Sequence, residues 1–161
     1  MPSSSELFVT VAFKAWKQNI DRATKLFAGL TEEQLLKEVA PGKNRLIYLW
    51  GHLAAVNDAM IPLLGIGDRL HPELDELFIV APDKSLPQLP TGVEIKSFWD
   101  EINGKLQSGL DSFAPEDWLK RHTSVSEEDF AKDPLRNRFA ILIGRTNHLA
   151  YHFAQAVLGT K

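Results

Sequence analysis

Cysteine is absent from the 161 residues of the chain. The sequence therefore excludes disulfides and thiolate ligands, and any metal site has to use histidine, carboxylate or backbone oxygen. No apolar stretch approaches the roughly 20 residues that a membrane span needs. Clustered basic residues are lacking too, and the net charge is −3. Because nucleic-acid binding depends on neutralising phosphates, we expect no nucleic-acid partner and no membrane association.

One apolar run near the N-terminus, Leu7–Phe13, is the candidate for a targeting signal. It has no preceding basic region and no small-residue cleavage site, and Lys14 ends it. The lack of cysteine also fits a reducing compartment, so we expect a soluble cytoplasmic protein. The chain suits a single domain, residues 1–161, whose core needs no metal in order to fold.

Helical periodicity dominates the sequence, and no useful length alternates as strands do. Four long helices are predicted, at Ser5–Ala28, Lys43–Leu64, Gly92–Phe113 and Asp133–Leu158. Ser3 with Glu6, and Thr91 with Glu94, form capping-box patterns at two of the predicted starts. The sequence therefore predicts an all-α fold.

The connection between the second and third predicted helices is unusually long. It spans about 25 residues, far more than most connections in helical bundles. It is rich in proline, with Pro72, Pro82, Pro87 and Pro90. Such a crossover lets the two helices that it joins run in the same direction. We therefore predict a four-helix bundle with up-down-down-up topology.

The first predicted helix carries an apolar stripe that we assign to the core. Its members are Phe8, Val11, Ala15, Ala23, Leu26 and Leu30. Phe13, Trp16 and Ile20 lie off this stripe and would leave apolar surface that a monomer rarely exposes. We therefore predict a homodimer.

The histidines are unevenly placed. His148 and His152 stand four residues apart on the last predicted helix, so both imidazoles can reach one ion. His52 lies in the second predicted helix beside small residues. Each feature alone also suits a structural role, because histidines in such positions are often only hydrogen-bonded parts of a core. His71 and His122 fall in predicted loops, where we expect them to be solvated.

Together these residues carry a resemblance to a known family. The segments Pro41–Leu53 and His148–His152, followed by Gln155, are similar in order and distance to the DinB-like (YfiT-like) superfamily of metal-dependent four-helix-bundle proteins. The resemblance implies that His52, His148 and His152 bind a divalent ion, commonly nickel or zinc. Gln155 is one turn from His152, and it either supports that ligand or is a solvated amide. Members often have glycine where this chain has Ala154.

Three neutral imidazoles would leave a divalent ion with open coordination positions, as in catalytic sites. Such an ion could activate water, bind a thiolate or polarise a carbonyl. Hydrolysis also needs a base, and none can be named. Asp58 is six positions from His52 and so points elsewhere on the helix, while Glu127, Glu128 and Asp129 lie in a predicted loop.

Some DinB-like relatives are transferases that use low-molecular-weight thiols such as bacillithiol or mycothiol. The resemblance therefore implies a metal-dependent thiol S-transferase that acts on small electrophiles. We predict that its pocket is lined by Tyr48 and by the small residues around Ala55 and Ala59. The alternatives are a non-catalytic metal-binding module of the stress response and a metal-dependent hydrolase. A helical dimer whose histidines are merely packed is a third reading, and it would bind no metal.

Overall fold

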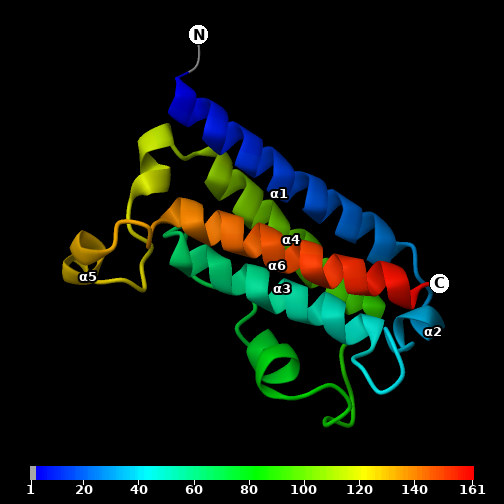
Figure 1. Ribbon diagram of the computed structural model, residues 1–161. Coiled ribbons are helices and arrows are strands. Elements are labelled where there is room, and N and C mark those ends of the chain that lie inside the picture. Colours follow the sequence, from blue (N-terminus) through cyan, green and yellow to red (C-terminus); the bar gives the residue numbers. More distant parts are fainter. Residues whose placement is uncertain (1–2) are drawn as a thin grey trace.

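Four long helices form the body of the protein in the computed structural model, which describes residues 3–161 (Figure 1). They are α1 (Ser4–Ala28), α3 (Leu46–Leu63), α4 (Gly92–Asp111) and α6 (Arg138–Gly159). Shorter helical segments join them, namely α2 (Glu32–Leu35), η1 (Glu76–Val80), η2 (Pro115–Leu119) and α5 (Glu127–Lys132). Within residues 3–161 the only β pairing is two isolated bridges. The predicted all-α fold is confirmed.

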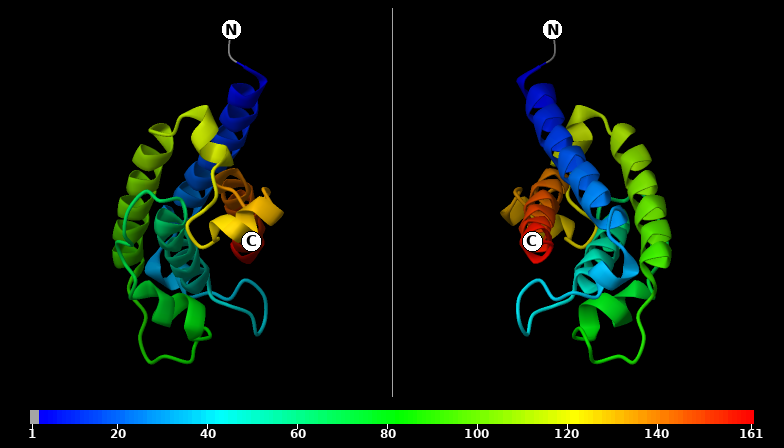
Figure 2. Two further views of the ribbon diagram at one scale, coloured as in Figure 1. Left: turned by 90° about the vertical axis from the view of Figure 1, so that its left-hand side faces the viewer. Right: turned by 90° about the vertical axis from the view of Figure 1, so that its right-hand side faces the viewer.

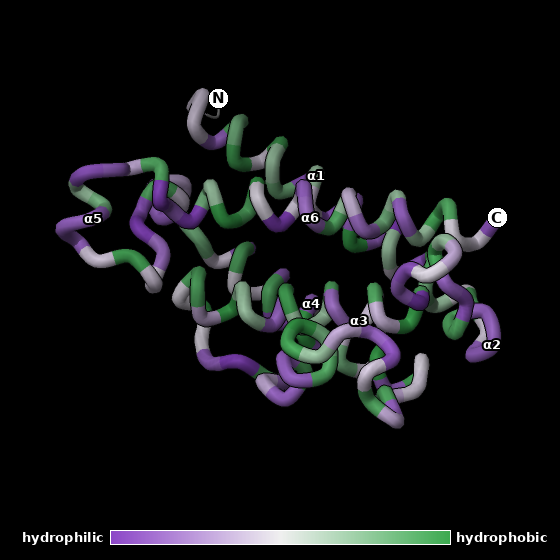
Figure 3. The backbone as a smooth tube through the Cα atoms, turned by 60° about the horizontal axis from the view of Figure 1, so that its bottom comes forward, coloured by the Kyte–Doolittle hydropathy of each residue, from purple (hydrophilic) through white to green (hydrophobic). Residues whose placement is uncertain are grey.

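The long helices have the predicted up-down-down-up order. In Figure 1, α1 and α6 run from left to right, while α3 and α4 both run from right to left. The turned views of Figure 2 place α3 between α4 and α6. Most residues of α3 are buried, because three elements surround this helix. Along α1 and α6, hydrophobic and hydrophilic stretches alternate (Figure 3). The site described below lies along the seam between α3 and α6.

Side-chain caps fix several helix starts. The predicted capping boxes are both present, at Ser3 with Glu6 and at Thr91 with Glu94. The last long helix begins later than predicted, however. Its N-cap is Asn137, whose side-chain oxygen accepts from the backbone N–H of Ala140 at 2.9 Å. The segment before it forms the separate helix α5, which has no buried residue and lies outside the bundle (Figure 1).

The second long helix also begins later than predicted, at Leu46. Its expected first turn is part of a tight loop instead, closed by the bridge between Glu38 and Arg45. Gly42 adopts a positive φ of 74° inside this loop, a conformation that favours glycine and interrupts a helix. The loop forms one wall of a groove that is also lined by His152.

The predicted core face of the first helix is confirmed at its C-terminal end, where Ala23 is buried and Leu26 and Leu30 pack against the core. Toward the N-terminus it is wrong. Trp16 and Ile20 are buried, whereas Phe8 and Val11 are 70% and 68% exposed. Phe13 stacks on Trp16, with ring centroids 5.9 Å apart. Aromatic rings bury the largest apolar areas, so the face that carries Trp16 has the greater free energy of burial. The surface from which the homodimer was predicted is therefore not exposed.

The crossover, residues 64–91, is tied to α3 by an internal carboxylate. Asp58 is fully buried and accepts from Arg69 Nε at 2.9 Å. It also accepts from the backbone N–H groups of Leu70 and His71, at 2.8 and 3.1 Å. Arg69 makes a second ion pair with Asp75. One buried side chain thus fixes the first part of the crossover against α3.

A second anchor holds the far end of the crossover at the start of α3. Asp83 accepts from the backbone N–H of Arg45 at 2.7 Å and from the Arg45 guanidinium at 2.7 Å. Burial raises the pKa of the Asp83 carboxyl, but the hydrogen bonds from Arg45 outweigh this and hold its pKa below the usual value. Between the two anchors, Phe78 of η1 is buried against Gly51. This contact brings the η1 backbone to the level of His52.

Among residues 3–161, no helix combines the length and the apolar character that crossing a membrane would take.

Candidate metal centre

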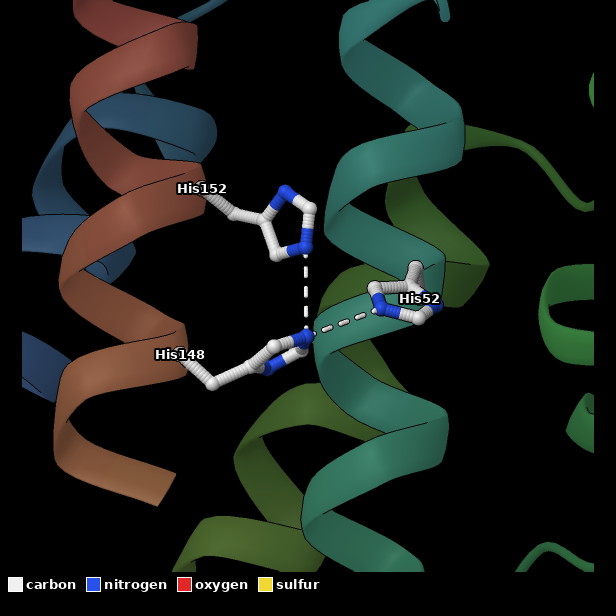
Figure 4. A group of neighbouring side chains, drawn as sticks. All are labelled: His52, His148 and His152. Carbon is white, nitrogen blue, oxygen red and sulfur yellow. Dashed lines mark hydrogen bonds between the residues drawn. The ribbon is translucent and has the colours of Figure 1, made fainter. Parts of the chain in front are cut away.

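Three histidines from two helices converge between α3 and α6 (Figure 4). His52 comes from α3, and His148 and His152 come from successive turns of α6. Each is partly buried. The Nε2 atom of His148 lies 3.2 Å from Nε2 of His52 and 3.2 Å from Nε2 of His152. The structure therefore brings together the three residues that the sequence singled out.

The spacing of the ring nitrogens matches the spacing of ligands on one ion. Histidine nitrogen binds zinc at about 2.0–2.1 Å, which places two ligand atoms about 2.9 Å apart at a right angle and about 3.3 Å apart at a tetrahedral angle. The two separations from His148 Nε2, 3.2 Å each, fall within this interval, and the ligand atoms of all three rings lie within 4.8 Å of one another.

Hydrogen bonds set the tautomers of two of the rings. His52 Nδ1 lies 2.8 Å from the carbonyl oxygen of Phe78, and His152 Nδ1 lies 2.7 Å from Gln155 Oε1. Both oxygens only accept, so each Nδ1 carries the proton and each Nε2 presents a lone pair. Lone pairs facing one another repel unless a proton or a cation lies between them. Such hydrogen bonds on the distal nitrogen are the usual support of metal-binding histidines.

The pKa values of all three imidazoles lie below the ordinary value. Burial is the main cause for each ring. For His148, the neighbouring charges of His152, His52 and Arg145 add to burial and lower the pKa to about 4. A metal needs neutral imidazole, so the site favours the form that binds a cation and disfavours the form that would repel it.

Metal binding is expected to release few protons near neutral pH. At pH 6, three ordinary histidines would together release about two protons on binding a metal. The lowered pKa values predict clearly fewer, because the free rings are already largely neutral. Calorimetric titration of zinc in buffers of different ionisation enthalpy measures this number. Release of about two protons at pH 6 would contradict the prediction.

The lowered pKa values of the three histidines also predict how the folding stability of the metal-free protein changes with pH. Below about pH 6.5 the unfolded chain takes up protons on its histidines, whereas His148 in the folded chain stays neutral until about pH 4. The metal-free protein should therefore lose stability as the pH falls through this window. Denaturant unfolding at pH 7, 6 and 5 provides the check, and a rise in stability toward pH 5 would contradict it.

Gln155 is expected to matter for metal affinity because its oxygen holds the His152 ring. Supporting hydrogen bonds of this kind typically contribute about 10- to 100-fold to metal affinity. Gln155→Leu should weaken zinc binding by about that factor in a competition titration. Gln18→Leu, at an exposed glutamine of α1, is the matched control. Equal affinity in both variants would mean that the Gln155 hydrogen bond has no such role.

The other residues singled out from the sequence lie elsewhere. The Tyr48 hydroxyl donates to the Ala81 carbonyl at 2.8 Å and so supports the crossover, while Ala55 is fully buried in the core. Neither residue lines the groove that contains His152. Asp58 does not belong to the histidine cluster, because Arg69 and the crossover backbone occupy its carboxylate. Ala154 is exposed, so its methyl group occupies no part of the site.

The two remaining histidines are not simply solvated. His71 lies 3.1 Å from Glu73 and 3.0 Å from Glu101, and its ring packs on Phe98. Burial lowers the pKa of His71, but the hydrogen bonds to Glu101 and Glu73 outweigh it and raise the pKa above the ordinary value. His122 Nδ1 lies 2.9 Å from Ser124 Oγ. Both rings are separate from the three converging histidines.

A groove of about 450 Å³ opens beside His152 and extends toward the end of α6. The exposed surface of its lining is mainly apolar, although Lys43, Asn44, His152 and Gln155 contribute polar groups. The residues around His152 are Val39, Ala40, Lys43, Asn44, Leu49, Tyr151, Gln155 and Leu158. The sequence reasoning missed this groove. One usable signal was Tyr151, an aromatic residue next to a candidate ligand, which is 62% exposed and whose ring lies 5.0 Å from that of His152.

No carboxylate belongs to the cluster. Within residues 3–161, His52, His148 and His152 are the one group of potential ligands close enough to share an ion. Three neutral nitrogen ligands leave the full charge of a divalent ion uncompensated and leave coordination positions open. Sites of this composition are typical of metal ions that bind a substrate.

The comparisons with known proteins agree with this fold. Residues 15–156 match the model of the DinB superfamily. A crystal structure of a conserved protein from Enterococcus faecalis is similar, with a TM-score of 0.64, 19% sequence identity and 94% of each chain covered. At this identity the likeness shows the fold alone. No match was found among curated proteins. Since the family match spans most of its length, the chain belongs to the DinB superfamily.

Proposed function

We propose that His52, His148 and His152 hold one divalent ion, nickel or zinc, through their Nε2 atoms. The observation that carries the proposal is the pair of 3.2 Å separations from His148 Nε2 to the Nε2 atoms of His52 and His152, two rings that carry their proton on Nδ1. Imidazole suits nickel, zinc and similar ions of intermediate softness. The remaining coordination positions are available to a small-molecule substrate.

For the reaction, we propose transfer of a low-molecular-weight thiol to a small electrophile. A divalent ion held by the three histidines would supply the positive charge that lowers the pKa of a thiol. The thiol proton passes to solvent, the sulfur lone pair forms a bond to the electrophilic carbon, and the leaving group departs with its electron pair. The groove beside His152 then positions the electrophile, and such positioning alone can supply much of the acceleration.

Two features support this reaction class over hydrolysis. The resemblance to thiol-dependent DinB-like relatives is one. The other is the composition of the site, because hydrolysis requires a base beside the water and no carboxylate joins the histidine cluster among residues 3–161. Low-molecular-weight thiols are kept reduced in the cytoplasm, so the proposal places the protein in that compartment.

A direct assay tests the reaction. The metal-loaded protein is mixed with monochlorobimane and, in separate runs, bacillithiol, mycothiol, glutathione or coenzyme A. Accelerated conjugation with at least one thiol is expected, and it should be lost in metal-free protein and in His52→Ala. His122→Ala is the matched control, because His122 contacts Ser124 and lies outside the cluster. Rates equal to the metal-free control for every thiol would overturn the transferase proposal.

That negative result would favour the second candidate, a non-catalytic metal-binding module of the stress response. The observation in its favour is that no acid or base group accompanies the three imidazoles in the described part of the chain. Such a module would keep metal affinity without turnover. A metal-dependent hydrolase remains the third candidate, and ester hydrolysis by the loaded protein would support it.

We also propose a homodimer. Its interface would be a different surface from the one predicted from the sequence. Leu7, Phe8 and Val11 are exposed on the first turns of α1, and Leu119 of η2 is 60% exposed. An apolar groove between Phe8 and Leu119 joins the two elements. A sedimentation mass of two chains supports the dimer, and a monomer mass at every concentration excludes it.

A further inference from the structure

His71 joins the first part of the crossover, residues 64–75, to α4. Its Nδ1 lies 3.1 Å from a carboxylate oxygen of Glu73 in the crossover, and its Nε2 lies 3.0 Å from a carboxylate oxygen of Glu101 on α4. The ring also packs on Phe98 of α4, with ring centroids 4.6 Å apart. We call His71 with these two carboxylates the His71 bridge. The backbone N–H of the same residue donates to Asp58, so the bridge stands where the crossover meets both α3 and α4.

The His71 bridge is complete only when its ring carries a positive charge. Carboxylate oxygens accept hydrogen bonds and cannot donate them, so each ring nitrogen that faces one has to carry a proton. The imidazolium form has two N–H groups and satisfies both carboxylates. A neutral imidazole has one N–H, and its other nitrogen would turn a lone pair toward a negatively charged oxygen. Loss of the ring proton therefore breaks one side of the bridge.

The two carboxylates of the bridge set the pKa of His71. The other charged groups around the bridge are Asp58 of α3, Arg69 and Asp75 of the crossover and Lys105 of α4. Arg69 is paired with both aspartates, and Lys105 lies one turn after Glu101. Burial lowers the pKa of His71, but the hydrogen bonds and charges of Glu101 and Glu73 outweigh burial and raise the pKa above the ordinary value.

This direction is opposite to that of the other four histidines, whose pKa values burial lowers. A raised pKa in the folded chain gives stability that is fully present below about pH 6.5, the ordinary value for histidine. That stability is lost as the pH rises through the folded value. The three converging histidines act on stability below about pH 6.5 instead, so the two effects fall in different pH windows.

We propose that the His71 bridge is a latch that holds the first part of the crossover against α4 while the ring is protonated and releases it when the ring loses its proton. The latch does not depend on the proposed metal chemistry, because none of the three converging histidines takes part in it. The same crossover carries the Phe78 carbonyl that orients His52.

Titration of the ring protons by NMR, from about pH 5 to about pH 9, tests the charge of the latch, whether or not the protein is loaded with zinc. His71 should titrate above the ordinary pKa of histidine. Glu101→Gln should lower this pKa, because the ring loses one of its two charged acceptors. Glu33→Gln, at an exposed glutamate of α2, is the matched control and should leave it unchanged. A His71 pKa at or below the ordinary value overturns the proposal.

Hydrogen exchange tests the release itself. The backbone N–H of Leu70 donates to Asp58 at 2.8 Å, directly before His71, so its exchange reports opening of this part of the crossover. After correction for the intrinsic rate, its protection should fall about two- to fivefold from about pH 6 to about pH 8, the factor that a partly exposed ion pair contributes. The fall should be absent in His71→Gln, smaller in Glu101→Gln and unchanged in Glu33→Gln. An equal fall in His71→Gln and wild type would mean that no such latch exists.

Discussion

Replacing His148 with alanine is expected to abolish tight metal binding and to leave a folded helical protein. His148 is the central member of the cluster, since its Nε2 is the atom within 3.2 Å of both other rings. Losing one of three ligands should lower the affinity for the metal by on the order of 100- to 1,000-fold. Competition titration measures the affinity, and circular dichroism measures the helix content.

The fold should survive because the core does not depend on the histidines. The buried cluster includes four tryptophans and many aliphatic residues, and none of the three rings belongs to it. His122→Ala is the matched control and should bind metal as the wild type does. If chelation alone melts the wild-type bundle at room temperature, the site is structural and the proposed open, substrate-binding site is wrong.

Replacing Asp58 with alanine is expected to give the largest loss of stability among the single changes considered. The buried carboxylate pairs with Arg69 and accepts from two backbone N–H groups of the crossover. Removing one partner of a buried ion pair typically costs about 3–5 kcal/mol. Because Arg69 keeps its pair with Asp75, we expect a value near the lower end of this range. The free energy of unfolding, measured in urea, should fall by about 3 kcal/mol.

Asp75→Ala is the matched control for this change. Asp75 binds the same guanidinium, but its side chain is 38% exposed. Exposed ion pairs contribute about 0–1 kcal/mol, so this variant should unfold close to the wild type. Equal losses in the two variants would mean that burial of Asp58 does not anchor the crossover. Crossover loosening should also release the Phe78 carbonyl from His52 and so weaken metal binding.

Patterns that depend on local spacing predicted the fold well. The two capping boxes and the long proline-rich crossover fixed helix starts and the direction of α3 and α4. The predicted core face was wrong for the N-terminal half of α1, because two apolar faces compete there. Only its neighbours decide between them, and Trp16 packs on Phe13, which in turn contacts Trp118 of η2, far along the chain.

The site was predictable in its ligands but not in their surroundings. The i, i+4 spacing of His148 and His152 is a local signal, and the resemblance supplied His52. The oxygen that orients His52 is a backbone carbonyl, at Phe78, and no side-chain pattern announces it.

The most direct test of the account is a crystal structure of the untagged protein reconstituted with zinc or nickel and measured at the absorption edge of the metal. The account predicts one anomalous peak per chain, about 2.0–2.1 Å from Nε2 of His52, His148 and His152, with coordination positions left for a small molecule. Three rings that diverge with no anomalous peak between them would contradict it.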